Sequence, residues 1–207
     1  MKRSFAPFAV GVALLAAPAL AFAGGPEPTE EKQKSAAEEF DRGRRLFQAK
    51  RYEEAALHFE NAFRDAPKSA PLRSAARARL AAGQLDRAAT LTALAEERYG
   101  DEEGTKELAK EIYPKVTSKL GSAVFSCNPG CLLTVDGSAV GFGEERVATA
   151  WLLPGPHEAV VTWSGERKAT QALVIKAGEK KSFSENAPAV VEKPVEQPVV
   201  LPPPPVL

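Results

Sequence analysis

The only two cysteines of the chain, Cys127 and Cys131, lie four residues apart around an Asn-Pro-Gly turn in the stretch SCNPGCLLTVDG. A redox-active pair more typically reads Cys-x-x-Cys at the start of a helix, where the helix dipole lowers the pKa of a thiol. A metal site would need two further ligands, and the two histidines, His58 and His157, lie in other segments. A structural disulfide is therefore predicted, with free thiols and a thiol–disulfide enzyme as the alternatives. Chain entropy gives so short a loop about 2 kcal/mol of stabilisation.

His157 is the other candidate for chemistry, because it follows Pro-Gly-Pro at the predicted start of a strand. No serine or cysteine nucleophile and no acidic partner accompanies it in a recognisable motif. Asp136 and the neighbouring Glu144 and Glu145 occur in turn and loop sequences, which are not typical of an acid/base pair. The sequence predicts a protein that is not an enzyme, with no catalytic residue, no metal ligand and no cofactor.

Residues 1–23 predict a cleaved export signal. Lys2 and Arg3 precede an apolar stretch that prolines interrupt, and this stretch closes with Ala21-Phe22-Ala23, the small-x-small pattern that a signal peptidase needs. An uncleaved N-terminal anchor is the alternative, and no transmembrane segment is predicted after cleavage. Export would place the protein in the periplasm, at the cell surface or outside the cell, where an oxidising environment preserves disulfides.

The charge of the chain is balanced. Loss of Lys2 and Arg3 with the signal would leave 25 of the 27 basic residues against 27 acidic ones. Nothing in this balance favours nucleic acid as a partner. The length of the mature chain suits two small domains of fewer than about 100 residues each.

Residues 187–207 form a proline-rich tail that ends in four consecutive prolines and Val-Leu. Proline excludes a regular helix or an inner strand and favours an extended conformation. The tail is interpreted as a ligand for a proline-binding groove or as a spacer. A disordered tail without a sequence-specific role is the alternative.

Residues 35–113 predict paired helices, with residues 24–34 as a linker before them. Ser35 and Glu38 match a capping box at the predicted helix start, and apolar residues then recur at steps of three and four. The segment AKRYEEA (49–55) matches AGQLDRA (82–88) further along the chain. A helix–turn–helix that repeats with a period of about 34 residues is typical of tetratricopeptide (TPR) arrays.

The segment resembles the TPR family at Gly43, Leu46, Ala55, Phe59, Ala62 and Pro67. The second copy is weaker, since Thr92 stands in the position of Phe59 and Gly100 in that of Pro67. An acidic helix that ends before Pro114 would cap the stack. The resemblance implies a concave peptide-binding groove formed by the first helix of each repeat. Its residues would be Phe40, Arg44, Phe47, Gln48, Arg73 and Arg77.

Arginines among aromatic side chains in such a groove suit an acidic peptide or a free carboxylate, because guanidinium groups pair bidentately with carboxylates. The alternative is a solvated basic face that binds nothing.

Residues 122–186, which follow a linker at 114–121, predict short strands separated by turn signals such as Asp136-Gly137 and Ser164-Gly165. This pattern favours a small antiparallel β sandwich or barrel. The fold class of the whole chain is therefore α+β, with helical repeats followed by an all-β domain.

The order of the turns in this half resembles the PEGA domain, a bacterial surface and periplasmic module. The matching segments are Pro129-Gly130-Cys131, Val135-Asp136-Gly137, Pro154-Gly155-Pro156-His157 and Ala177-Gly178-Glu179. The first turn is one residue short, and Cys131 stands where the family has alanine.

Together the two resemblances imply a scaffold or adaptor that binds a protein or peptide partner in the bacterial cell envelope. The alternative is a module that binds a cell-wall polymer or surface glycan through the β domain. In that alternative Trp151 would stack on sugar rings, whereas Trp163 shares a predicted strand face with core residues.

Overall fold

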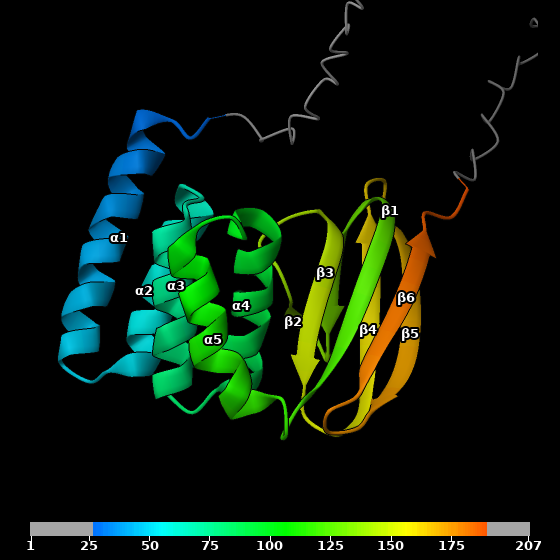
Figure 1. Cartoon of the computed structure of the whole chain (residues 1–207). Helices are drawn as coiled ribbons and strands as arrows, with labels where there is room; N and C mark the ends of the chain where they lie inside the picture. Colours follow the sequence, from blue (N-terminus) through cyan, green and yellow to red (C-terminus); the bar gives the residue numbers. More distant parts are fainter. Residues whose placement is uncertain (1–26, 190–207) are drawn as a thin grey trace, which may run out of the picture.

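The computed structural model describes residues 27–189, which fold into a helical half followed by a β half (Figure 1). The predicted signal (1–23) and nearly all of the predicted tail (187–207) lie outside the described residues. The α+β class, with helical repeats before the strands, is confirmed. The helices are α1 (Glu30–Gln48), α2 (Tyr52–Asp65), α3 (Ser69–Ala81), α4 (Leu85–Tyr99) and α5 (Glu103–Val116).

The first two helical hairpins repeat each other in their backbone hydrogen bonds. The N–H of Arg51 donates to the carbonyl of Leu46 at 2.9 Å, and the N–H of Gln84 donates to that of Arg79 at the same distance. Lys50 and Gly83 occupy the same place in the two turns, with φ angles of 60° and 78°. The repeat in the sequence is therefore a repeat of the three-dimensional structure as well.

Close packing of α1 on α2 depends on Gly43. A Cβ atom at this position would lie 2.7 Å from the Cδ1 and Cε1 atoms of Phe59, closer than real Cβ contacts. Phe59 is 3% exposed, and its ring centroid lies 5.3 Å from that of Phe40. A glycine, a buried aromatic ring and small alanines such as Ala55 thus let the two helices of the hairpin approach each other.

The predicted start of the first helix is wrong by several residues. Helix α1 begins at Glu30, inside the predicted linker 24–34, and the side chain of Thr29 accepts a hydrogen bond from the N–H of Lys32 at 3.4 Å. Ser35 lies inside the helix, where its hydroxyl donates to Asp65 Oδ2 at 2.7 Å. Glu30 and Glu31 in the first turn favour the earlier start, because their negative charges are attracted by the positive end of the helix dipole.

The predicted end of the last helix is also wrong. Helix α5 continues through Pro114 to Val116, so it extends into the predicted linker 114–121. Proline lacks an N–H and usually breaks a helix interior, but Pro114 is exposed and lies in the last turn. Burial of Val116 and Leu120, both 0% exposed, anchors this segment to the helical core.

The strands of the β half surround the long strand β1. Its first part, Gly121 to Ser126, pairs with β3 on one side and with β6 on the other, and its last part, Leu132 to Val135, pairs with β4. The pairing shifts register between Ser126 and Cys131. The strands are β1 (Gly121–Val135), β2 (Ser138–Ala139), β3 (Glu145–Leu152), β4 (Gly155–Trp163), β5 (Arg167–Ile175) and β6 (Lys180–Asn186).

The antiparallel prediction holds for every ladder among these strands except one, because β6 runs parallel to β1. The β half has its own core, in which Phe125 stacks on Phe183 with ring centroids 4.8 Å apart. Trp163 is 2% exposed in this core, as the alternation of its strand predicts. In Figure 1 the edge of the β half next to α4 is strand β3.

Candidate functional site

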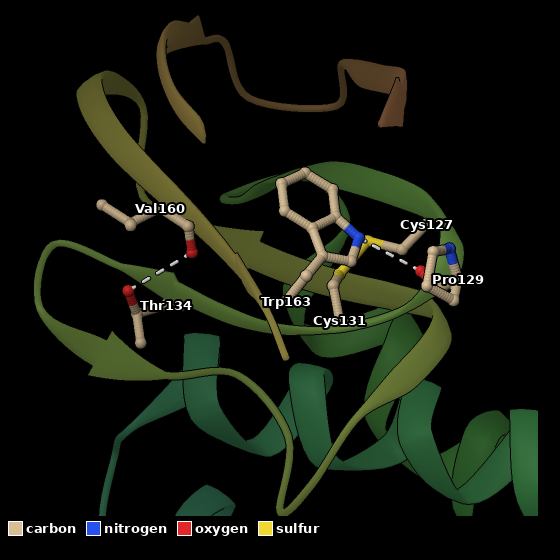
Figure 2. The surroundings of a disulfide bond; sticks show 6 residues. All are labelled: Cys127, Pro129, Cys131, Thr134, Val160 and Trp163. Atoms are coloured by element: carbon tan, nitrogen blue, oxygen red, sulfur yellow. Dashed lines mark hydrogen bonds between the residues drawn. A yellow bond between two sulfur atoms is a disulfide. The ribbon is translucent and has the colours of Figure 1, made fainter. Parts of the chain in front are cut away.

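The two cysteines form a disulfide, as predicted, at the point where β1 changes partner strands (Figure 2). Their Cα atoms lie 5.8 Å apart, and Cys131 is completely buried while Cys127 is 6% exposed. The indole N–H of Trp163 donates to the carbonyl of Pro129, between the two cysteines, at 3.2 Å. The disulfide therefore fixes a turn on the β core, and its buried position argues for a structural role.

His157 has an acceptor at each ring nitrogen. Its Nδ1 lies 2.6 Å from Asp136 Oδ2 and its Nε2 lies 2.8 Å from the carbonyl oxygen of Leu153. The other carboxylate oxygen of Asp136 accepts the N–H of Glu158 at 2.9 Å. Because both partners of the ring are acceptors, the geometry favours the doubly protonated imidazolium.

The electrostatics of this pair agree with its geometry. Burial lowers the pKa of His157, but the hydrogen bonds to Asp136 and to the Leu153 carbonyl outweigh it, so this pKa is raised above 6.5. The hydrogen bond to His157, followed by that from the N–H of Glu158, lowers the pKa of Asp136 below 3.8. The ring thus ties the turn after β1 to the start of β4, and it has no free nitrogen for acid/base chemistry.

We expect the pair to make the stability of the protein depend on pH. The contribution of His157 to the free energy of unfolding is fully present below pH 6.5 and is lost as the pH rises through its raised pKa. The contribution of Asp136 is fully present above pH 3.8 and is lost as the pH falls through its lowered pKa. The wild type should therefore exceed His157→Gln in unfolding free energy by about 1–2 kcal/mol between these two values. Urea unfolding of both proteins across the pH range measures this difference.

NMR titration of the His157 ring supplies the direct check. Its pKa should lie above 6.5 in the wild type and should fall in Asp136→Asn, which removes the carboxylate but keeps the size of the side chain. A ring that titrates at or below 6.5 in the wild type would contradict the charged pair.

The aromatic residues predicted for the peptide groove are partly used in packing. The ring centroid of Phe40 lies 5.3 Å from that of Phe59, and the centroid of Phe47 lies 5.1 Å from that of Tyr52. Both residues are partly buried, whereas Gln48 is exposed at the end of α1. These aromatic side chains hold α1 on α2 and leave part of their surface open.

The predicted arginines Arg73 and Arg77 lie on α3 and bind carboxylates of the chain itself. Arg73 Nη1 and the hydroxyl of Ser69 each donate to Glu102 at 2.6 Å, and Arg77 Nε donates to Glu111 at 2.8 Å. The hydrogen bond from Ser69, followed by that from Arg73, lowers the pKa of Glu102. Acidic side chains at and before α5 therefore already occupy the position where an acidic peptide was expected.

Arg44 differs from the other two predicted arginines. Its side chain is 60% exposed, and its one ion pair in the described chain is with Asp41 at 3.5 Å, a helical neighbour. An exposed pair of this kind contributes little and exchanges readily with solvent. Of the six predicted groove residues, Arg44 and Gln48 are the most available to a partner.

A surface that the sequence reasoning missed joins the two halves. The loop after β2 inserts Phe142 against the completely buried Phe63 of α2, with ring centroids 5.0 Å apart. The guanidinium carbons of Arg64 and Arg87 lie 5.8 and 5.5 Å from the centroid of Phe142. A phenylalanine between two glycines in a polar loop, Gly141-Phe142-Gly143, was the available signal.

Hydrogen bonds strengthen the contact between the two halves. Arg87 donates to the carbonyl oxygens of Ala139 and Val140 at 2.9 and 3.0 Å, and Arg98 binds Glu145. The N–H of Trp151 donates to the hydroxyl of Thr90 at 2.9 Å. These contacts dock the β half on α2 and α4, whereas α1 and α3 would line the predicted groove.

Trp151, predicted to stack on sugars, lies at this junction. Its ring stacks on that of Tyr113 with centroids 5.4 Å apart, and it packs against the helical core. Its indole nitrogen is buried without a hydrogen-bond partner among the described residues. One ring face is thus covered by Tyr113, and the glycan-stacking role stays a prediction.

Next to Trp151 a cleft of about 500 Å³ opens between α4 and α5 on one wall and β1, β3 and the start of β6 on the other. Within residues 27–189 no three His, Cys, Asp or Glu side chains are arranged to hold a metal ion. In the same part of the chain, no helix has the length and apolarity that crossing a bilayer requires.

Comparison with known families matches residues 46–108 to the tetratricopeptide repeat. The match begins late in α1 and ends in α5, so it covers the two equivalent turns at Lys50 and Gly83. Comparison with curated proteins finds no match. The helical half is thus a TPR-like module, and such modules are typical of protein–protein interaction.

Proposed function

We propose that the chain is an exported, non-enzymatic adaptor of a bacterial cell envelope that binds a partner protein through the concave face of its helical repeats. The match of residues 46–108 to the tetratricopeptide repeat carries the proposal. The exposed Arg44 and Gln48 of α1, together with the arginines of α3, supply the contacts to the partner. The partner is an extended acidic segment or a chain terminus.

The arginines of α3 would bind the partner by exchanging a carboxylate of the chain itself for a carboxylate of the partner. Arg73 and Arg77 are paired with Glu102 and Glu111, whose side chains are 46% and 38% exposed. Ion pairs of this exposure are worth about 1 kcal/mol or less, so a carboxylate of a partner competes with them at little cost. Because a partner must displace Glu102 and Glu111, segments with few acidic residues would bind weakly.

Two further features support an envelope location. Residues 1–23 have the pattern of an export signal, and the buried Cys127–Cys131 disulfide suits an oxidising compartment. In this proposal the β half is a PEGA-like adhesive or spacer module, and the proline-rich tail is an extended arm. The engagement of both nitrogens of His157 supports a role other than catalysis.

Crosslinking in intact cells tests the proposal with the double variant Arg44→Gln/Arg77→Gln. Glutamine removes the charge without placing a carboxylate beside Glu111. We expect the variant to lose the proteins that the wild type captures, with binding weakened by about tenfold or more. The matched control, Arg146→Gln/Lys168→Gln, removes two exposed charges of the β half and should capture the same proteins.

Capture of the same proteins by both variants would overturn the concave-face proposal. Capture of wall polymer in place of proteins would favour the alternative, in which the β half binds a glycan and Trp151 contributes to the site.

A further inference from the structure

The cleft between the two halves has a lining that the concave-face proposal does not use. It measures about 500 Å³, within the range of roughly 300–1,000 Å³ that is usual for ligand sites. Three carboxylates line it, from Glu96, Glu97 and Glu179, against the single ammonium group of Lys180. The local charge is therefore negative, opposite to that of the arginines on the concave face.

The two glutamates of α4 are available to a ligand. Both are exposed, and neither forms an ion pair with another residue in the range 27–189. Their neighbour Arg98 instead binds Glu145. Glu179, by contrast, accepts the N–H of Lys176 at 2.9 Å and lies 3.7 Å from the Nζ of Lys181. Because both glutamates line the cleft, a cation bound there would be attracted by two carboxylates.

An aromatic pair lies beside these carboxylates. The rings of Tyr113 and Trp151 both line the cleft and stack on each other with centroids 5.4 Å apart. The hydroxyl of Tyr113 donates to Glu96, which places one carboxylate next to the aromatic pair. Ring faces attract cations, and arginine in particular stacks on them. Carboxylates next to aromatic rings form a site for a guanidinium or ammonium group.

A buried donor in the same wall points to a polypeptide as the carrier of that cation. The indole nitrogen of Trp151 has no hydrogen-bond partner among the described residues. An unsatisfied buried donor of this kind is rare and calls for an explanation. A backbone carbonyl of a bound peptide would supply the acceptor that this donor lacks.

We propose that this cleft binds an arginine or lysine side chain of a partner protein, held by Glu96 and Glu97 beside Tyr113 and Trp151. The inference rests on the proposed function in one respect, that the partner is a protein. It adds a second contact of opposite charge to the acidic one proposed for the concave face. Two sites on one molecule would make binding depend on a partner that presents both charges at the right spacing.

NMR titration of the mature chain with a blocked tetra-arginine peptide tests the site at low salt. We expect the largest amide shifts in residues 93–97, 122–124 and 149–151. The variant Glu96→Gln/Glu97→Gln should bind the peptide about tenfold more weakly. A glutamine oxygen at position 96 still accepts the Tyr113 hydroxyl, so the wall should keep its structure. The control Glu30→Gln/Glu31→Gln removes another exposed pair of neighbouring glutamates, from α1, and should bind as the wild type does.

Equal weakening in the two variants, or shifts spread over all acidic surfaces, would overturn the inference in favour of nonspecific attraction. Shifts of the cleft residues by chitotetraose but not by the peptide would also overturn it, in favour of a carbohydrate site. Specific peptide binding in the cleft, combined with unchanged capture by Arg44→Gln/Arg77→Gln, would uphold this inference and overturn the concave-face proposal. Loss of capture by Arg44→Gln/Arg77→Gln, combined with no specific binding of the peptide in the cleft, would uphold the concave-face proposal and overturn this inference.

Discussion

Replacement of Glu60 by glutamine will lower the free energy of unfolding by about 3 kcal/mol, because two arginines share this buried carboxylate. Arg79 Nε donates to Glu60 Oε1 at 2.7 Å, and Arg87 Nη2 donates to Oε2 at 3.0 Å. Glu60 is 6% exposed. A glutamine has one acceptor oxygen, so its amide nitrogen would face the N–H groups of the other arginine, and both largely buried guanidinium groups would lose their counter-ion.

The loss should reach beyond the helices. Arg87 also donates to the carbonyls of Ala139 and Val140, so an arginine released by Glu60→Gln would hold the β half less firmly. Urea unfolding followed by circular dichroism measures the change. Glu54→Gln, on the same helix, breaks an exposed pair with Arg51 and should leave the midpoint nearly unchanged. Equal midpoints for the two variants would contradict a stabilising role for Glu60.

The repeat architecture could be predicted from the sequence because its determinants are local. The residue at position 43 must be glycine because a larger side chain would clash with Phe59. Lys50 and Gly83 occupy equivalent turns, so the repeat can be recognised in the sequence. The disulfide was predictable for the same reason, since its cysteines are close together in the sequence. The helix ends were not, because Thr29 and Ser35 are both acceptable caps and only the full set of contacts selects between them.

The surroundings of the predicted site could not be foreseen. Arg73 and Arg77 were expected on the first helix of the second repeat, and they lie there. Their partners Glu102 and Glu111 are 29 and 34 residues away in sequence, and no local pattern links them. Trp151 was likewise a candidate for stacking on sugars, and its contact with Tyr113 could not be foreseen because it exists only once the two halves are docked.

Replacement of Phe142 by alanine will uncouple the two halves. The ring packs against Phe63 and lies beside two guanidinium groups, so its removal should cost about 2–3 kcal/mol of the contact between the halves. Both tryptophans of the chain belong to the β half, whereas the helices dominate circular dichroism at 222 nm. In urea the two signals should change together in the wild type and at separate concentrations in Phe142→Ala.

Leu153→Ala is the matched control, because Leu153 is a loop residue of the β half that is 61% exposed. Its two signals should stay coincident. Coincident signals in Phe142→Ala as well, with a midpoint equal to that of the control, would mean that Arg87, Arg98 and Thr90 suffice to dock the halves. Separate transitions would instead show that one side chain decides whether α4 and β3 face each other across the cleft. The acidic cleft would then be a property of the docked protein, because its two walls come from different halves.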